Sequence, residues 1–316
     1  MFEIAASLVA GLLLSLALSP IAIPFLKKLK FGQTIRDEGP KSHQAKSGTP
    51  TMGGIVIIVA ALSASIVFSR RNSEFAIIAA SFLGFGLIGF LDDYIKVVLK
   101  RNLGLRAWQK IALQLGLSLF LTIFSMRSVG SDVLVPFTGV FIDLGWFYVP
   151  FMIFVVLAFV NAVNLTDGLD GLASGVSIFS FVVFIAMGML FSQETVSIFA
   201  AALTGALIGF LKVNYHPAKV FMGDTGSMAL GGALSAMILV TRSPLVMLIA
   251  GAVFVLESLS VVMQVLYFKA TKGKRIFKMT PIHHHFELSG WDEVKVVQRF
   301  WMASAVFAFV GILSIL

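Results

Sequence analysis

The chain has 316 residues, of which 58% are hydrophobic and 13% are charged, and its net charge at pH 7 is +8. Soluble domains carry about 25% charged residues, so this composition excludes an ordinary soluble fold and predicts a polytopic membrane protein. The absence of cysteine excludes disulfides, iron–sulfur clusters and thiolate metal centres.

Ten apolar runs are candidates for membrane-spanning helices, because a helix needs about 20 apolar residues to cross the hydrocarbon. The first run is interpreted as a retained span and not as a signal peptide, since no Lys or Arg precedes it and no cleavage site follows it. We therefore expect one all-α integral-membrane domain over residues 1–316. The runs cover approximately residues 3–26, 53–69, 75–91, 110–127, 146–162, 171–191, 196–211, 226–241, 244–268 and 296–316.

The distribution of Lys and Arg predicts how these spans are oriented. An even number of spans places both termini on one side, and 20 of the 24 Lys and Arg residues lie in the loops on the other side. The positive-inside rule then makes those loops cytoplasmic and both termini extracytoplasmic. A basic cytoplasmic face favours anionic headgroups and anionic substrates.

The first cytoplasmic loop, residues 26–54, ends in small and polar residues beside Lys46. Thr49 or Thr51 can cap the next helix, and Gly53–Gly54 permits close approach of a ligand or of another backbone. Taken alone, the pattern is better explained as an ordinary capped helix start.

The third apolar run ends in two adjacent carboxylates, Asp92 and Asp93, which Lys96, Lys100 and Arg101 follow closely. Such a pair can be solvated at the membrane edge, but its basic surroundings favour a metal or phosphate site. Adjacent residues of a helix point about 100° apart, so one carboxylate can face a ligand while the other faces a neighbouring helix or a second ligand.

The extracytoplasmic loop at residues 128–145 alternates weakly between apolar and polar residues and contains Pro136 and Gly139. This pattern is typical of a short hairpin, and it carries no evident chemistry.

A dense polar stretch ends the fifth span. Its acceptors and acids have no Lys or Arg beside them, which suits cation binding, although a polar turn with two helix caps is the alternative. The residues are Asn161, Asn164, Thr166, Asp167 and Asp170.

The seventh span is followed by Asn214, His216 and Lys219, and the segment GDTGS, with Asp224, opens the eighth. The second, sixth and eighth spans all begin at the cytoplasmic face, where the free N–H groups of helix N-termini attract phosphate.

Two polar residues lie inside the ninth run. Glu257 is expected to face the bundle interior and to form a hydrogen bond there, with a structural role favoured over a catalytic one. Gln264 lies two turns nearer the cytoplasm and could reach the site.

The last cytoplasmic loop contains His283, His284 and His285 in succession. Three adjacent histidines rarely converge on one zinc ion, and the internal position argues against an affinity tag. A phosphate or substrate contact and a proton relay are the alternatives.

Together these residues predict a site at the cytoplasmic face. Carboxylates and amides suit Mg²⁺, whereas lysines and helix N-termini suit phosphate groups. A metal, a cationic clamp and a base are the parts that phosphoryl transfer needs, with one substrate from the membrane and one from the cytosol.

Four motifs resemble the polyprenyl-phosphate N-acetylhexosamine-1-phosphate transferases. They are FLDDYIK at 90–96, NLTDGLDGL at 164–172, MGDTGS at 222–227 and PIHHHFE at 281–287. The histidine run is similar to that of the branch that transfers phospho-N-acetylmuramoyl-pentapeptide. The resemblance implies transfer from UDP-N-acetylmuramoyl-pentapeptide to undecaprenyl phosphate, with Mg²⁺, in the bacterial inner membrane. It leaves a homodimer open and implies no nucleic-acid partner.

The resemblance also implies roles for individual residues. Asp224 resembles the Mg²⁺ ligand, and Asp92 resembles either the base that deprotonates the lipid phosphate or the nucleophile of a two-step route. Asp93 resembles its essential neighbour, and His283 the essential histidine. The implied substrate-binding residues are Lys46, Thr51, Lys96, Lys110, Asn164, Asp167, Gly168, Asp170, Asn214, Phe221, Gln264 and His284.

Two other functions compete with this interpretation. A sister enzyme that transfers N-acetylglucosamine-1-phosphate would share the aspartates but not the histidine loop. A secondary transporter would place its charges near the midplane and show internal repeats. Here the acids gather at one face, and only Glu257 lies deep in a span.

Overall fold

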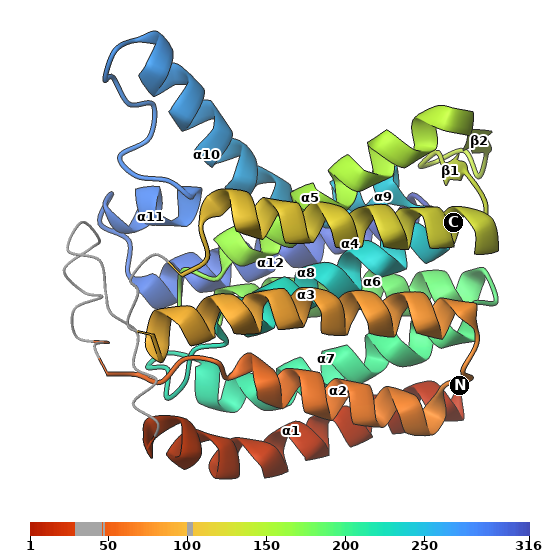
Figure 1. The fold of residues 1–316 in the computed structure, drawn as a ribbon, viewed down its shortest axis with the longest axis horizontal. Helices are drawn as coiled ribbons and strands as arrows, with labels where there is room; N and C mark the ends of the chain where they lie inside the picture. The colour runs from red at the N-terminus through yellow and green to blue at the C-terminus, as the bar shows by residue number, and fades with distance from the viewer. Residues whose placement is uncertain (29–45, 47, 100–103) are drawn as a thin grey trace.

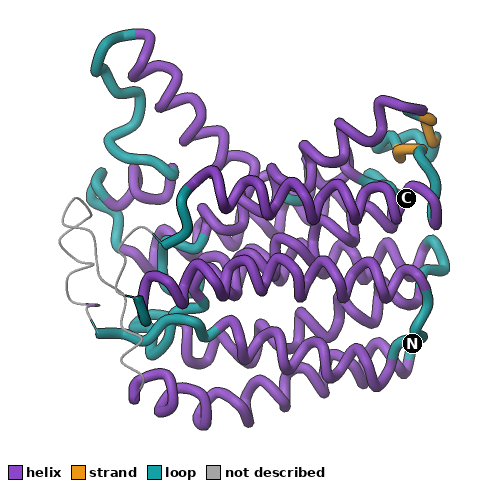
Figure 2. Tube along the Cα trace, viewed as in Figure 1, coloured by secondary structure: helices purple, strands orange, loops and turns teal. Residues whose placement is uncertain are grey.

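The fold, a computed structural model, is a bundle of long helices with one two-stranded hairpin (Figures 1 and 2). The structure describes residues 1–28, 46, 48–99 and 104–316. Lys100, Arg101 and most of the loop 26–54, which was predicted to be cytoplasmic, lie outside these ranges. The elements are α1 (Phe2–Lys28), α2 (Gly54–Phe68), α3 (Ser73–Val97), α4 (Ala107–Ser128), β1 (Asp132–Leu134), β2 (Phe141–Asp143), η2 (Gly145–Phe147), α5 (Tyr148–Thr166), α6 (Leu172–Leu190), α7 (Glu194–Asn214), α8 (Gly223–Thr241), α9 (Pro244–Ala250), α10 (Ala252–Ala270), α11 (Ile282–Glu287) and α12 (Glu293–Leu313).

Within the described ranges, nine helices are long and apolar enough to cross a membrane, which confirms a multi-pass membrane protein. The remaining predicted span, 53–69, is the apolar helix α2, whose 15 residues reach only about 22 Å at 1.5 Å per residue. The hydrocarbon core is about 30 Å thick, so α2 is shorter than a full crossing.

The prediction of one continuous helix over 244–268 was wrong. The run is divided at Gly251, whose backbone (φ −95°, ψ 21°) separates α9 from α10. Glycine tolerates such a break because it has no side chain to pack and loses much conformational freedom in a helix. As a result, α10 leaves the bundle at an angle and projects away from it (Figure 1).

Both chain termini lie at one end of the bundle, the end that also carries the β1–β2 hairpin (Figure 1). The hairpin is antiparallel and pairs Asp132 with Asp143 and Leu134 with Phe141, which confirms the strand prediction for 128–145. The end of α3 and the α10–α11 loop lie at the opposite end. The structure therefore separates the termini from the polar motifs, as the even number of predicted spans requires.

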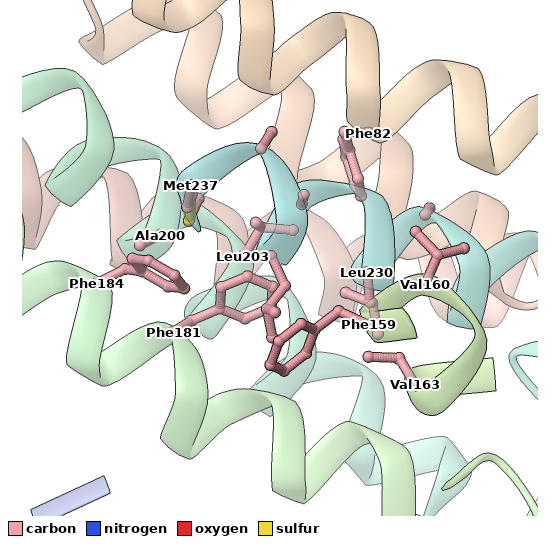
Figure 3. Close-up of a cluster of buried hydrophobic side chains, with 14 of the residues drawn as sticks. Phe82, Phe159, Val160, Val163, Phe181, Phe184, Ala200, Leu203, Leu230 and Met237 are labelled. Atoms are coloured by element: carbon pink, nitrogen blue, oxygen red, sulfur yellow. The ribbon is translucent and has the colours of Figure 1, made fainter. Parts of the chain in front are cut away.

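Helix α8 is the centre of the core, because every residue from Thr225 to Thr241 is buried. Its small residues let α3 and α5 pack closely around it, and large apolar side chains from α5, α6 and α7 fill the space on its other sides (Figure 3). Such burial of apolar groups fixes α8 and, with it, the residues of its first turn.

Two glycine contacts bring three helices together at the start of α8. A Cβ on Gly89 of α3 would lie 2.1 Å from the carbonyl oxygen of Asp224, and a Cβ on Gly54 of α2 would lie 2.2 Å from the backbone of Gly226. Real Cβ atoms do not approach backbone so closely, so only glycine permits these crossings. The same small-residue packing is common in membrane helices.

Gly89→Ala is expected to destabilise the protein by about 1–3 kcal/mol, the usual range for overpacking, and to lower activity by displacing Asp224. The matched control is Gly116→Ala on α4, where an added Cβ meets nothing within 4 Å. Thermal unfolding in detergent and a turnover assay measure both effects. Equal stability and activity of the two variants would contradict the close-packing account.

Candidate active site

Asp224 stands in the first turn of α8 and receives polar contacts from three other helices. Its Oδ2 accepts hydrogen bonds from the ammonium groups of Lys96 on α3 (2.9 Å) and Lys110 on α4 (3.0 Å). Its Oδ1 accepts one from the Asn164 amide on α5 (2.9 Å). Residues separated by up to 128 positions in the sequence therefore meet at one carboxylate. Together with Asp92, we call Asp224, Lys96, Lys110 and Asn164 the Asp224 cluster.

Asp92 is 2% exposed and belongs to the same cluster. Its Oδ2 lies 2.5 Å from Lys96 Nζ, and its Oδ1 accepts a hydrogen bond from the backbone N–H of Leu105 (2.8 Å). Lys96 consequently bridges the carboxylates of Asp92 and Asp224. In this arrangement the ammonium offsets the repulsion between two neighbouring negative charges.

Asp93 faces the other way and caps α8. Its carboxylate accepts hydrogen bonds from the backbone N–H groups of Asp224 (3.2 Å) and Thr225 (2.9 Å) and from the Thr225 hydroxyl (2.7 Å). A carboxylate at a helix N-terminus satisfies otherwise unpaired donors and interacts favourably with the helix dipole. Asp92 and Asp93 thus divide into one residue that faces the cluster and one that positions it.

The cap changes one sequence-based expectation. The N–H groups of Asp224 and Thr225 were expected to attract phosphate, but they are already bonded to Asp93. At the start of α2, the N–H groups of Gly53 and Gly54 donate to the carbonyl oxygens of Phe221 and Met222. These donors serve the fold, and Lys96 and Lys110 are the cationic side chains of the Asp224 cluster.

A second group of charged residues surrounds Lys46. The Lys46 ammonium donates to Asp170 Oδ1 (2.7 Å) and to Glu293 Oε1 (2.5 Å). His216 Nδ1 lies 3.2 Å from Asp170 Oδ2 and 3.5 Å from Glu293 Oε2. We call these four residues the Lys46 cluster; it joins the loops after α5 and α7 to the first turn of α12.

Two cation sites can be considered among the described residues. Ligand atoms of Asp170, His216 and Glu293 lie within 4.8 Å of one another, but the Lys46 ammonium already contacts both carboxylates. In the Asp224 cluster, carboxylate and amide oxygens form the hard donor set that Mg²⁺ prefers. Lys96 and Lys110 contact its carboxylates in the same way, so lysines are paired with the acids of both clusters, and the oxygen donors of the Asp224 cluster fit a divalent ion.

Asp167 follows α5 directly, outside the membrane-spanning segments. Burial raises the pKa of its carboxyl well above the ordinary range, and the negative charges of Asp224, Asp93 and Asp170 raise it further. Asp167 therefore favours its protonated, neutral form more than an exposed aspartate does.

The three histidines begin α11 and have different surroundings. His283 is completely buried and places Nδ1 3.0 Å from Glu257 Oε2. His284 Nδ1 lies 2.8 Å from Glu287 Oε2, and His285 Nδ1 accepts a hydrogen bond from the Lys278 N–H. The rings do not converge on one point, which agrees with the argument against a zinc site of three adjacent histidines.

Two of the predicted substrate-binding residues already form hydrogen bonds within the protein. Asn214 accepts a hydrogen bond from Ser174 Oγ (2.9 Å) and donates one to the Val220 carbonyl (3.1 Å). Gln264 binds the backbone of Ile276 and Phe277, which fixes the loop before the histidines. These bonds position two loops, and a direct contact with substrate stays a prediction for both residues.

Thr51, Phe221 and Gly168 lie beside the predicted motifs. The Phe221 N–H donates to the Pro50 carbonyl, which brings Thr51 next to Gly223, where an added Cβ would lie 2.6 Å from Thr51 Oγ1. An added Cβ at Gly168 would lie 2.3 Å from His283 Nε2. The loops thus approach one another as the predicted site requires, while the contacts of these residues with substrate stay predictions.

Sequence reasoning missed Glu293, which neutralises Lys46 and accepts the Asp170 backbone N–H (2.9 Å). Its signal was available, since a carboxylate beside the last apolar run resembles Asp92 and Asp93 at the end of the third. Ser227, one turn after Asp224, was also missed and accepts a hydrogen bond from Asn164 (2.8 Å).

Comparisons with known proteins agree with this geometry. Residues 75–242 match the profile described as Glycosyl transferase family 4, and residues 46–58 match the phospho-N-acetylmuramoyl-pentapeptide-transferase signature 1. The chain is therefore a member of the family 4 class of glycosyl transferases.

Curated relatives define the family more closely. A phospho-N-acetylmuramoyl-pentapeptide-transferase of Thermoanaerobacter sp. (strain X514) is 50% identical, with 97% of each chain covered. Those of Bacillus licheniformis and Bacillus subtilis (strain 168) are each 51% identical, with 97% of this chain and 96% of theirs covered. The chain belongs to the family of phospho-N-acetylmuramoyl-pentapeptide transferases.

Asp167→Asn is expected to raise the thermal stability of the protein above the folded-state pKa of Asp167. A carboxyl whose pKa is raised by folding contributes its stability at low pH, and this contribution is lost as pH rises through the folded-state pKa. The wild type should therefore lose stability with rising pH more steeply than the variant. Melting temperatures in detergent across pH 5–9 test this, with Asp143→Asn on the hairpin as control, and parallel curves would contradict the charge assignment.

Proposed function

We propose that this chain transfers phospho-N-acetylmuramoyl-pentapeptide from UDP-N-acetylmuramoyl-pentapeptide to undecaprenyl phosphate, giving lipid I and UMP for peptidoglycan synthesis. Membership of the transferase family supports the reaction, and the names of the relatives favour it over an N-acetylglucosamine-1-phosphate transferase or a transporter. The single structural observation that supports the site is the convergence of Asp92, Lys96, Lys110 and Asn164 on Asp224.

The site would work at the cytoplasmic face of a bacterial inner membrane, with both termini extracytoplasmic. Its end of the bundle is opposite the termini and carries the basic loops, which suits a nucleotide-sugar from the cytosol and a lipid phosphate from the bilayer (Figure 1).

The reaction joins two phosphate groups. An oxygen of the lipid phosphate attacks the sugar-bearing phosphorus of the diphosphate, the bond to the bridging oxygen breaks, and UMP leaves. The charges of Lys96 and Lys110 would hold the phosphates beside Asp92, which acts as base or, in a two-step route, as nucleophile. Positioning and electrostatic stabilisation are the main contributions that proteins make to phosphoryl transfer.

Asp224 is the proposed Mg²⁺ ligand. When bound there, Mg²⁺ would supply positive charge to the diphosphate. Lys96 and Lys110, which contact Asp224, would bind the phosphate oxygens, and Asn164 would keep the carboxylate oriented through its bond to Oδ1. Asp93 would hold the Asp224 carboxylate in position by capping α8.

The assay that tests the function supplies purified protein with undecaprenyl phosphate and either UDP-N-acetylmuramoyl-pentapeptide or UDP-N-acetylglucosamine. UMP release and a lipid-linked product are expected only with the first donor. Turnover of the second donor alone would indicate the sister enzyme, and no UMP release with either would contradict the proposal. Exchange of labelled UMP into the donor without lipid would distinguish the two-step from the one-step route.

Asp224→Asn is expected to abolish Mg²⁺-dependent turnover, with a loss of at least about 10³-fold, because the amide removes the charge that holds the ion. The fold should persist, since the amide can still occupy the space. Asp143→Asn, a carboxylate change on the hairpin at the other end of the bundle, is the matched control. Full activity of Asp224→Asn would remove the metal assignment.

Lys46→Ala is expected to weaken binding of the UDP-sugar by roughly 10-fold or more. Loss of the ammonium leaves the negative charges of Asp170 and Glu293 unpaired, and these charges repel the anionic substrate. Calorimetric titration with the UDP-sugar measures the affinity, and exposed Lys272→Ala provides the control. Unchanged affinity in Lys46→Ala would count against a substrate-binding role for this residue.

A further inference from the structure

A buried acid–histidine pair lies behind the candidate site. Glu257, in the second turn of α10, and His283, in the first turn of α11, are both completely buried. Glu257 Oε2 lies 3.0 Å from His283 Nδ1, although the two residues are 26 positions apart. The resemblance implies that His283 is the essential histidine, but the mechanism proposed above gives a part to neither His283 nor Glu257.

The other nitrogen of the ring is turned towards the site. His283 Nε2 has no hydrogen-bond partner among the described residues, although it is buried. A Cβ added to Gly168 would lie 2.3 Å from Nε2 and 2.8 Å from the adjacent ring carbon Cε1. The ring edge therefore rests on the loop that carries Asp167 and Asp170, and the absent side chain of Gly168 leaves room for it.

A carboxylate can only accept a hydrogen bond, so a neutral His283 must carry its proton on Nδ1 when it pairs with Glu257. This fixes both the tautomer and the orientation of the ring, and it leaves the lone pair of Nε2 facing the Gly168 loop. A buried polar atom without a partner calls for an explanation, and a ligand that binds it is one of them. A carboxylate inside a membrane-spanning helix is unusual and is typically functional.

We infer that Glu257 is a positioning residue, which holds His283 with Nε2 directed at the Gly168 loop as a hydrogen-bond acceptor for the substrate. The inference rests on the proposed function for the identity of the substrate. Glu257 therefore affects the reaction only through His283.

A double-mutant cycle tests this dependence on His283. The variants are Glu257→Gln, His283→Gln and the double variant, each assayed for kcat and KM with the UDP-sugar and undecaprenyl phosphate. Glu257→Gln is expected to lower kcat/KM at least tenfold, because the amide can donate to Nδ1 and place the ring proton on Nε2. The double variant should match His283→Gln within about twofold, since Glu257 has no other route to the substrate.

The control is Ser260→Ala, which removes a buried hydroxyl one turn along α10 and should leave kcat/KM unchanged. A purely structural role for Glu257 predicts the opposite pattern, with losses that multiply in the double variant. Multiplying losses, or full activity of Glu257→Gln, would overturn the inference.

A second readout does not depend on turnover. The ¹⁵N spectrum of histidine-labelled protein is expected to show His283 with its proton on Nδ1 in the wild type and a different signal in Glu257→Gln. Gly168→Ala should also perturb this signal, because the new methyl group meets Nε2. An unchanged His283 signal in Glu257→Gln would overturn the inference, whereas absence of UMP release by the wild type would contradict only the proposed function.

Discussion

The hydrogen bonds from the start of α8 to Asp93 are the interaction on which the site depends. They fix the backbone of Asp224 and Thr225 against α3, at a crossing so close that Gly89 must lack a side chain. Because α8 is buried along nearly its whole length, it cannot shift to relieve a change at this point. The position of the Asp224 carboxylate is thus set by packing and capping, before any ligand binds.

Charge balance is the second constraint. Asp92 and Asp224 share Lys96, and Asp170 shares Lys46 with Glu293, so lysine ammoniums stabilise acids that would otherwise repel one another in a poorly solvated place. A diphosphate with its divalent ion carries both signs of charge, and it can exchange with these internal ion pairs without leaving a charge unpaired. Under the proposed function, each acid and each lysine would be a partner for part of the substrate complex.

Much of this could be predicted from the sequence. Long apolar runs predicted nearly all the spans, and the Asp92–Asp93, Asp167–Asp170 and Asp224 motifs were placed at one end because adjacent spans alternate in direction. The break at Gly251 was not predicted, because an apolar run does not show whether its helix is continuous. Glu293 was missed because its pairing with Lys46 joins segments 247 residues apart, and tertiary packing alone brings them together. The N–H groups of α8 were predicted to be free because local sequence does not reveal that Asp93 caps them.

The most direct test of this account uses Mn²⁺ in place of Mg²⁺ and electron paramagnetic resonance of the wild-type protein with the UDP-sugar. The account predicts a bound ion with phosphorus hyperfine coupling, which is lost in Asp224→Asn and kept in Glu293→Gln. Retention of the signal in Asp224→Asn, or its loss in Glu293→Gln alone, would place the metal in the Lys46 cluster and contradict the central claim.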